Sequence, residues 1–246
     1  MKIFAQQIQK PITIKKQNPV AFKGNSTRFV PSETDSFVRG DVINSYVCDP
    51  LTNRLQKVEF TKSLSISKAI ESLIMPKDRN LQNILASEFH TFEELATIWE
   101  DLQKMPQIMN KKVVSLNGIG LHALAFETED GKILKITDMN HFPDGRKPAF
   151  FDLPILESGS HNHTHYYLEE KVSFNNSSKE LFALVDKIKQ AGYEMKDYLM
   201  KNSEIKFWQF GKTAGGELYL IDPGCAVEPV KYRSVLNAIK KFLFRK

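Results

Sequence analysis

Apolar residues recur at the spacing of a helix face in the segment that follows residue 62. The stretch SLSISKAIESLIM places five of them on one side of a helix that Pro76 ends: Ile66, Ala69, Ile70, Leu73 and Ile74. A second helix is expected to begin at Thr91, because Thr91 and Glu94 have the spacing of a capping box. Its apolar stripe continues to Leu102. The pattern therefore predicts a helical extension over residues 58–110.

From Lys112 the pattern changes to short β-branched and aromatic runs separated by turn residues. These runs are VVSLNGIG, ALAFETEDGKILKIT and HYYLEEKVSF, and the EDGK sequence at 129–132 is typical of a hairpin turn. One helix is predicted from the capping box of Ser177 and Glu180 to Gly192. A strand–turn–strand unit follows over residues 205–222, and the chain ends in a basic amphipathic stretch, VKYRSVLNAIKKFLFRK. Because hairpins join most of the strands, the expected fold class is α+β with an antiparallel sheet.

Composition and charge narrow the possible domain organisation, ligands and location of the protein. Residues 1–57 show no sustained period and mix Pro, Gly, Ser, Thr and Lys, which predicts an extended or partly disordered segment before the 58–110 extension and a compact domain over 111–246. The net charge of +5 is compatible with phosphate-bearing ligands and does not require nucleic acid. There is no long apolar run and no signal-peptide core, and two cysteines argue against a disulfide framework. These features predict a chain without a transmembrane segment, acting in a cytoplasm or exported into a host cytosol by a Sec-independent route.

Candidate chemistry begins at Asp222, which ends the apolar strand LYLI and precedes Pro223 and Gly224. Such an aspartate is either a turn or capping residue, or a carboxylate that faces a cleft at the strand end. Upstream, Gly118 and Gly120 sit between two strands, where the absence of a Cβ lets the backbone approach phosphate oxygens. Lys135, on the second strand after that turn, would add a point charge to the same phosphates and contribute little to fold stability.

These residues, in this order, resemble the protein-kinase fold over about residues 112–227. LNGIGLHALAFETEDGKILKIT is similar to the glycine-rich loop and the next two strands, with Lys135 in the place of the phosphate-binding lysine. LYLIDPG is similar to the strand that enters the Asp-Phe-Gly motif. The resemblance implies an antiparallel N-lobe sheet, a truncated C-lobe, ATP and Mg²⁺ as ligands, adenine contacts near Glu170 and Val172, and Asp222 as a magnesium ligand.

The resemblance leaves two registers for the catalytic loop. In the first, Asp197 is the catalytic carboxylate and Asn202 the second magnesium ligand, which keeps the usual residue types. In the second, Glu204 and Gln209 take these roles at the same spacing, and Gln209 lies at the interval before Asp222 that a tight hairpin needs. The sequence slightly favours the second register.

Two departures from the kinase pattern affect function. Residues 136–152 have no helical period, so the helix that normally carries the lysine's glutamate partner is missing. Glu93, Glu94 or Glu100 of the preceding helix would have to replace it. Few residues follow Gly224, as in minimal kinases that bacteria inject as effectors and in compact phage kinases.

Three functions remain open at this level. The favoured one is ATP- and Mg²⁺-dependent phosphoryl transfer to an acceptor that the sequence does not name, protein or small molecule, with a protein expected as partner or substrate. The second is a pseudokinase that binds a protein partner, and the third is an unrelated α+β domain whose glycine turn is structural. The alternating His161, His163 and His165 offer imidazoles on one strand face, but no fourth ligand is evident and zinc is not predicted.

Overall fold

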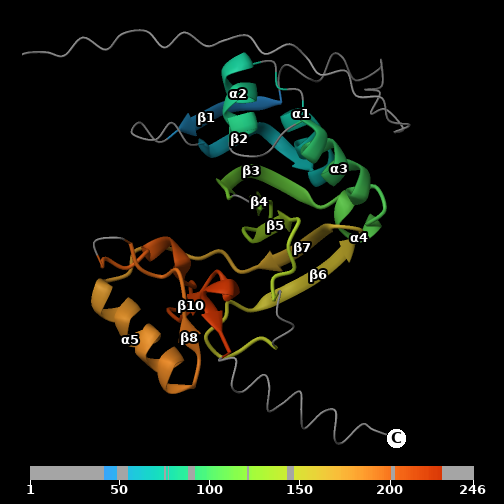
Figure 1. The fold of residues 1–246 in the computed structure, drawn as a ribbon. Helices are drawn as coiled ribbons and strands as arrows, with labels where there is room; N and C mark the ends of the chain where they lie inside the picture. The colour runs from blue at the N-terminus through green and yellow to red at the C-terminus, as the bar shows by residue number, and fades with distance from the viewer. Residues whose placement is uncertain are drawn as a thin grey trace, which may run out of the picture. The chain divides into compact units, whose positions relative to one another are not determined.

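The elements of the chain are arranged around one large antiparallel sheet (Figure 1). The structure is a computed structural model, and it describes residues 42–48, 55–74, 76, 78–87, 92–120, 122–142, 147–200 and 203–228. All of these residues belong to a single compact unit. The basic C-terminal stretch, Asn202 and Thr91 lie outside the described residues.

The helices and strands have the following bounds. The helices are α1 (Ile66–Ile74), α2 (Arg79–Ser87), α3 (Phe92–Leu102), α4 (Pro106–Met109) and α5 (Ser178–Gln190). The strands of the large sheet are β1 (Ile43–Cys48), β2 (Leu55–Ser65), β3 (Lys112–Ile119), β4 (Ala123–Thr128), β5 (Ile133–Thr137), β6 (Ile155–His161) and β7 (Thr164–Glu169). The smaller elements are β8 (Glu194–Met195), η2 (Phe207–Gln209), β9 (Phe210–Lys212), β10 (Leu218–Leu220), η3 (Pro223–Cys225) and β11 (Ala226–Val227).

The large sheet has seven strands in the order β1-β2-β3-β4-β5-β7-β6, and every neighbouring pair is antiparallel. The mixed α+β class with an antiparallel sheet is therefore confirmed. Strand β2 was not predicted, and it pairs with β3 across the expected division at residue 111. The segment 58–110 thus begins as a strand of this sheet. Its helices connect β2 to β3, so the segment is part of the sheet domain rather than a separate extension.

The two faces of the sheet differ in burial, and this difference positions the site. Leu124 and Phe126 of β4, with Leu134 of β5, are fully buried on one face. Their neighbours Ala125 and Lys135 point to the other face, because successive side chains of a strand alternate. Lys135 therefore lies on the less buried face of the sheet.

Helix α3 packs on the apolar face of the sheet, against β7 and helix α1. The buried carboxylate of Asp101 accepts hydrogen bonds from Asn162 Nδ2 and Thr164 Oγ1, each at 2.7 Å. Thr164 alternates along β7 with Tyr167, which is opposite Lys135 in the neighbouring strand. The helix and Lys135 are consequently on opposite faces of the sheet.

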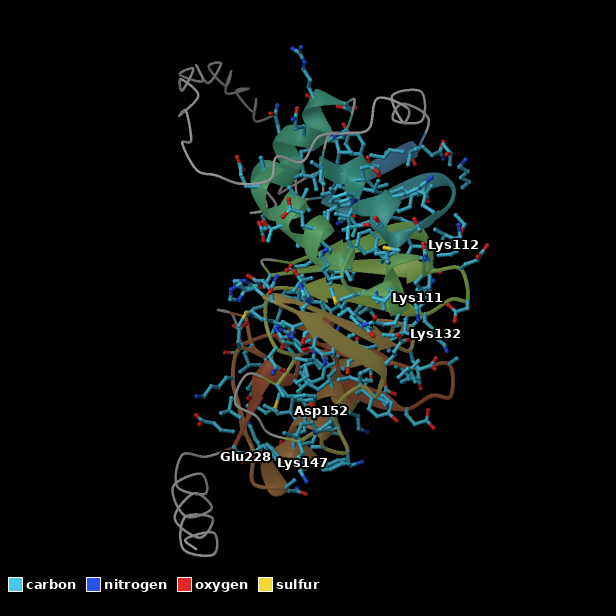
Figure 2. The ribbon with its side chains drawn as sticks, turned by 90° about the vertical axis from the view of Figure 1, so that its right-hand side faces the viewer. Lys111, Lys112, Lys132, Lys147, Asp152 and Glu228 are labelled. Carbon is cyan, nitrogen blue, oxygen red and sulfur yellow. The ribbon has the colours of Figure 1, made fainter. Side chains whose placement is uncertain are left out.

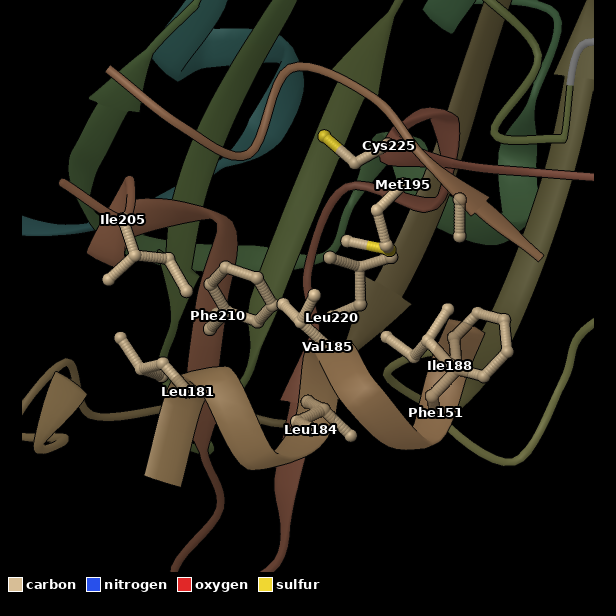
Figure 3. Packing of buried hydrophobic residues seen from close by; sticks show 11 residues of the cluster. Phe151, Leu181, Leu184, Val185, Ile188, Met195, Ile205, Phe210, Leu220 and Cys225 are labelled. Carbon is tan, nitrogen blue, oxygen red and sulfur yellow. The ribbon is translucent and has the colours of Figure 1, made fainter. Parts of the chain in front are cut away.

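A second hydrophobic core lies between α5 and the short C-terminal strands (Figure 3). Helix α5 begins with the expected capping box, in which Ser177 and Glu180 satisfy each other's backbone amides. The side chains packed in this core include Phe151, Leu181, Val185, Phe210 and Leu220. Asp152, labelled in Figure 2, is buried beside Phe151 and accepts a hydrogen bond from the Ala149 amide at 2.7 Å.

The predicted C-terminal hairpin is present, and it fixes the place of Asp222. Strands β9 and β10 pair with Phe210 opposite Leu220, and the Ile221 amide donates to the Gln209 carbonyl at 2.9 Å. The Leu153 amide donates to the Leu220 carbonyl, so β10 is also tied to the segment before β6. The end of β10 is thereby held in position on both sides.

Candidate functional site

Lys135 connects the large sheet to the end of β10. Its ammonium group forms an ion pair with Glu169 Oε2 at 2.7 Å and donates a hydrogen bond to the Ile221 carbonyl at 3.2 Å. Ile221 immediately precedes Asp222 in the chain. The lysine is therefore fixed close to the aspartate that the sequence singled out.

Glu169 is the carboxylate partner of Lys135, and its side chain is 1 % exposed. Burial raises its pKa, and the charge and hydrogen bond of Lys135 oppose that increase. The expectation that Glu93, Glu94 or Glu100 would take this role is wrong, because α3 lies on the other face of the sheet. Glu169 shares the face of Lys135 because β5 and β7 pair with Ile133 opposite Glu169.

Asp222 combines the two roles that the sequence left open. Its Oδ1 accepts a hydrogen bond from the Gly224 amide at 2.9 Å, so it caps the short η3 turn. Its carboxylate is also exposed to the pocket described next. Beside it, burial raises the pKa of the Cys225 thiol, which argues against a thiolate nucleophile at this position.

A pocket of about 500 Å³ lies beside Lys135 and Asp222, within the usual range for small-molecule sites. It brings together four of the residues predicted from the sequence: Gly120, Lys135, Asp197 and Asp222. The other residues that line it are His122, Ala123, Thr137, Met139, Asn140, His141, Tyr167, Ile221, Pro223, Gly224 and Cys225. Cationic and carboxylate side chains thus line one pocket that is open to solvent.

The glycine turn borders this pocket at Gly120. Its amide donates to the Ala123 carbonyl at 2.8 Å, so this backbone group is used inside the β3–β4 hairpin. A Cβ on Gly118 would meet Ala125 Cβ at 3.5 Å, an ordinary contact, and neither glycine has a positive φ. The geometry of the turn does not require glycine, and Gly118 is not among the residues that line the pocket.

The two catalytic-loop registers differ in where their carboxylates lie. Asp197 lines the pocket together with Asp222, and the Lys206 ammonium pairs with its Oδ1. Glu204 and Gln209 are not among the described residues that line the pocket, although the Gln209 backbone is beside Ile221 as the hairpin predicted. The geometry therefore brings Asp197, rather than Glu204, to the site.

The predicted adenine-binding residues, Glu170 and Val172, also lie outside this pocket. Glu170 is exposed, and Val172 packs over Gly211 of β9. A Cβ on Gly211 would lie 2.6 Å from Val172 Cβ and 2.9 Å from Ile221 Cδ1. Gly211 is therefore needed for Val172 to pack closely against the β9–β10 hairpin.

This packing can be tested with Gly211→Ala. We expect the added methyl group to destabilise the fold by about 1–3 kcal/mol, because it forces Val172 and Ile221 apart. Urea unfolding followed by circular dichroism measures the loss. Adding Val172→Gly, which removes the Cβ as well as the two methyl groups of Val172, should relieve the clash and recover part of the loss. A Gly215→Ala variant in the β9–β10 turn, where only the flexible Glu217 side chain is close, serves as the control.

Among the described residues, no group of three or more His, Cys, Asp or Glu side chains could hold a metal by itself. Mg²⁺ needs fewer protein ligands than zinc, because it commonly binds one or two carboxylates together with substrate phosphates. Asp222 and Asp197, which share the pocket with Lys135, fit that smaller requirement.

Comparison with protein families matched no family model, and comparison with curated proteins and with solved structures gave no significant match. None of the helices in the described ranges combines the length and apolar character needed to cross a bilayer. The function therefore has to be inferred from the site itself.

Proposed function

We propose that the chain binds a nucleoside triphosphate with Mg²⁺ in the pocket of Lys135 and Asp222 and transfers its terminal phosphoryl group. The single observation that carries the proposal is the meeting of Gly120, Lys135, Asp197 and Asp222 at one pocket. These residues come from four separate parts of the chain, and their order along it is that of the protein-kinase motifs.

Each residue has a role that follows from its chemistry. The Lys135 ammonium would neutralise phosphate oxygens, because it is a donor fixed at the pocket wall. Asp222 would hold Mg²⁺, which would supply positive charge against the phosphate groups. Asp197 would accept a hydrogen bond from the acceptor hydroxyl and orient it, as a kinase catalytic carboxylate does. The Lys206 ammonium pairs with the Asp197 carboxylate, which lines the pocket.

A nucleotide-binding module without transfer activity is the second candidate. It is supported by Glu204 and Gln209, the carboxylate and amide of one catalytic-loop register, because neither is among the described residues that line the pocket. A protein as partner or acceptor remains part of the proposal for either candidate. The exposed rings of Phe207 and Trp208, in T-shaped contact with centroids 5.2 Å apart, offer an aromatic surface for such a partner.

Nucleotide binding is tested by thermal denaturation with ATP in the presence and absence of Mg²⁺. At a ligand concentration about 100 times the Kd, we expect a stabilisation of about 2.7 kcal/mol for the unchanged chain. Asp222→Asn should remove the part of this stabilisation that depends on Mg²⁺, because the amide offers one neutral oxygen instead of a carboxylate. Asp186→Asn, on the exposed side of α5, is the matched control.

Phosphoryl transfer is tested separately with radiolabelled ATP and a panel of protein acceptors. Asp197→Asn should lower the rate about 100-fold or more while nucleotide binding is retained, and Glu204→Gln should change it far less. The absence of stabilisation by any nucleotide, with Mg²⁺ or Mn²⁺, would contradict the proposed function. Binding without transfer by the unchanged chain would select the second candidate.

A further inference from the structure

The Lys135–Glu169 pair has a third member, His141, which follows β5 in the chain. Its side chain is 8 % exposed, and its Nε2 lies 3.2 Å from Glu169 Oε1. Lys135 occupies the other carboxylate oxygen, Oε2, at 2.7 Å. The buried carboxylate thus has one cationic or potentially cationic neighbour at each oxygen.

His141 is itself held in place by Tyr167 of β7. The His141 backbone amide donates to the Tyr167 hydroxyl at 2.8 Å, and the two rings lie against each other with centroids 4.6 Å apart. The Phe142 ring meets the imidazole edge-on at 5.1 Å. These contacts fix the imidazole over the end of β7, so its position relative to Glu169 is determined by the fold.

A carboxylate buried as deeply as Glu169 needs a partner for both of its oxygens. If only Lys135 were present, the carboxylate could turn about its terminal bond and present either oxygen to the ammonium group. His141 removes that freedom, because its Nε2 contacts Oε1 and leaves Oε2 directed at Lys135. The contact between His141 and Glu169 is a close approach of Nε2 to Oε1 rather than an aligned hydrogen bond.

We propose that His141 is a positioning residue for Lys135, acting through Glu169, and that these three residues replace the helix-borne glutamate of protein kinases. This inference rests on the proposed function, in which Lys135 contacts nucleotide phosphates. In kinases the lysine is paired with a glutamate from a helix. Here the partner comes from the neighbouring strand of the same sheet, and His141, which also lines the pocket, completes its environment.

The test compares His141→Gln with His165→Gln. His165 is a matched control, because it lies on the same face of β7 beside the Tyr167 ring but does not line the pocket. The first readout is the ¹⁵N-edited NMR signal of the Lys135 ammonium group, assigned with Lys135→Met. In the unchanged chain, pairing with Glu169 should protect the ammonium protons from exchange with water. His141→Gln should broaden or shift this signal, and His165→Gln should leave it unchanged.

The second readout is the Kd of Mg-ATP by titration calorimetry. We expect His141→Gln to weaken binding about fivefold to tenfold, a coupling typical of residues in one contact network. In a Glu169→Gln background the same histidine change should have no further effect, because the group through which it acts has lost its charge. An equal effect of His141→Gln in both backgrounds would overturn the proposal.

The two readouts separate this inference from the proposed function. If the unchanged chain binds no nucleotide, the proposed function fails, and the NMR signal alone decides whether His141 positions Lys135. If the unchanged chain binds nucleotide and His141→Gln alters neither the Lys135 signal nor the Kd, the proposed function stands and the positioning role is wrong.

Discussion

Replacing Glu169 with alanine is expected to lower the free energy of unfolding by about 3–5 kcal/mol, because removal of one partner leaves the other charge of a buried pair uncompensated. Lys135 would keep its hydrogen bond to the Ile221 carbonyl but would lose the carboxylate that neutralises it. The change also removes a side chain from a site that is 1 % exposed, which leaves a cavity against Tyr167 and His141.

The measurement is urea unfolding monitored by tryptophan fluorescence and circular dichroism. Glu170→Ala is the matched control, since this neighbouring glutamate is exposed and its loss should change stability by no more than about 0.5 kcal/mol. If the two variants were equally stable, the Lys135–Glu169 pair would contribute nothing to the fold, and its role would be confined to the pocket.

The second large effect is expected for Lys135→Met, and it depends on pH. Near neutral pH we expect a loss of about 3 kcal/mol, because the buried Glu169 carboxylate would lose its cation. This reverses the expectation from sequence alone that a cleft lysine contributes little to stability. The reason is the near-complete burial of Glu169, which the sequence does not reveal.

The sign of the pH dependence follows from the pKa of Glu169. Burial already raises it above the ordinary value of 4.5, and Lys135 opposes that increase, so removal of the lysine raises it further. Between 4.5 and the raised pKa, the folded variant binds a proton that the unfolded chain does not bind. Its stability should therefore fall as the pH rises through this window, by up to about 1.4 kcal/mol per pH unit, and recover in acid.

Unfolding curves of Lys135→Met and the unchanged chain, recorded from about pH 4 to pH 8, provide the check on this linkage. The control is Lys171→Met, since Lys171 pairs with Glu127 at the surface and its side chain is 51 % exposed. Its loss should be no more than about 1 kcal/mol. A difference between Lys135→Met and the unchanged chain that stays constant across this range would show that Glu169 does not carry the buried charge.

The sequence predicted those helices and strands that are marked by residues close together in the chain, such as a capping box or a turn. The capping box at Ser177 located α5, and the alternation of apolar residues with the turn at Gly131 located β4 and β5. Strand β2 was missed because its pairing with β3 is irregular between Glu59 and Leu64, so its apolar residues do not alternate with a steady period of two. The short helix α2 was also missed, although its buried residues Leu81, Ile84 and Leu85 recur at helical spacing.

At the candidate site, too, only residues with a local sequence signal could be predicted. Lys135 and Asp222 were recognisable because each lies next to a turn or strand with a local signature. Glu169 was not, because its contact with Lys135 is diagonal across two strands and depends on the register of β5 with β7. The signal available in the sequence was Glu169 itself, an acidic residue at the end of the apolar run HYYLE. Its pairing with Lys135 could be recognised only once the order of the strands was known.

The contact between Lys135 and the Ile221 carbonyl joins positions 86 residues apart in the chain. Closing so long a loop costs conformational entropy before any stabilising contact forms. Contacts between residues so far apart in the chain therefore form slowly. The hairpin of β4 and β5 can assemble locally, whereas the pocket requires that the sheet and the β9–β10 hairpin have both formed and met. The chain can thus form most of its regular structure before the pocket beside Lys135 and Asp222 exists.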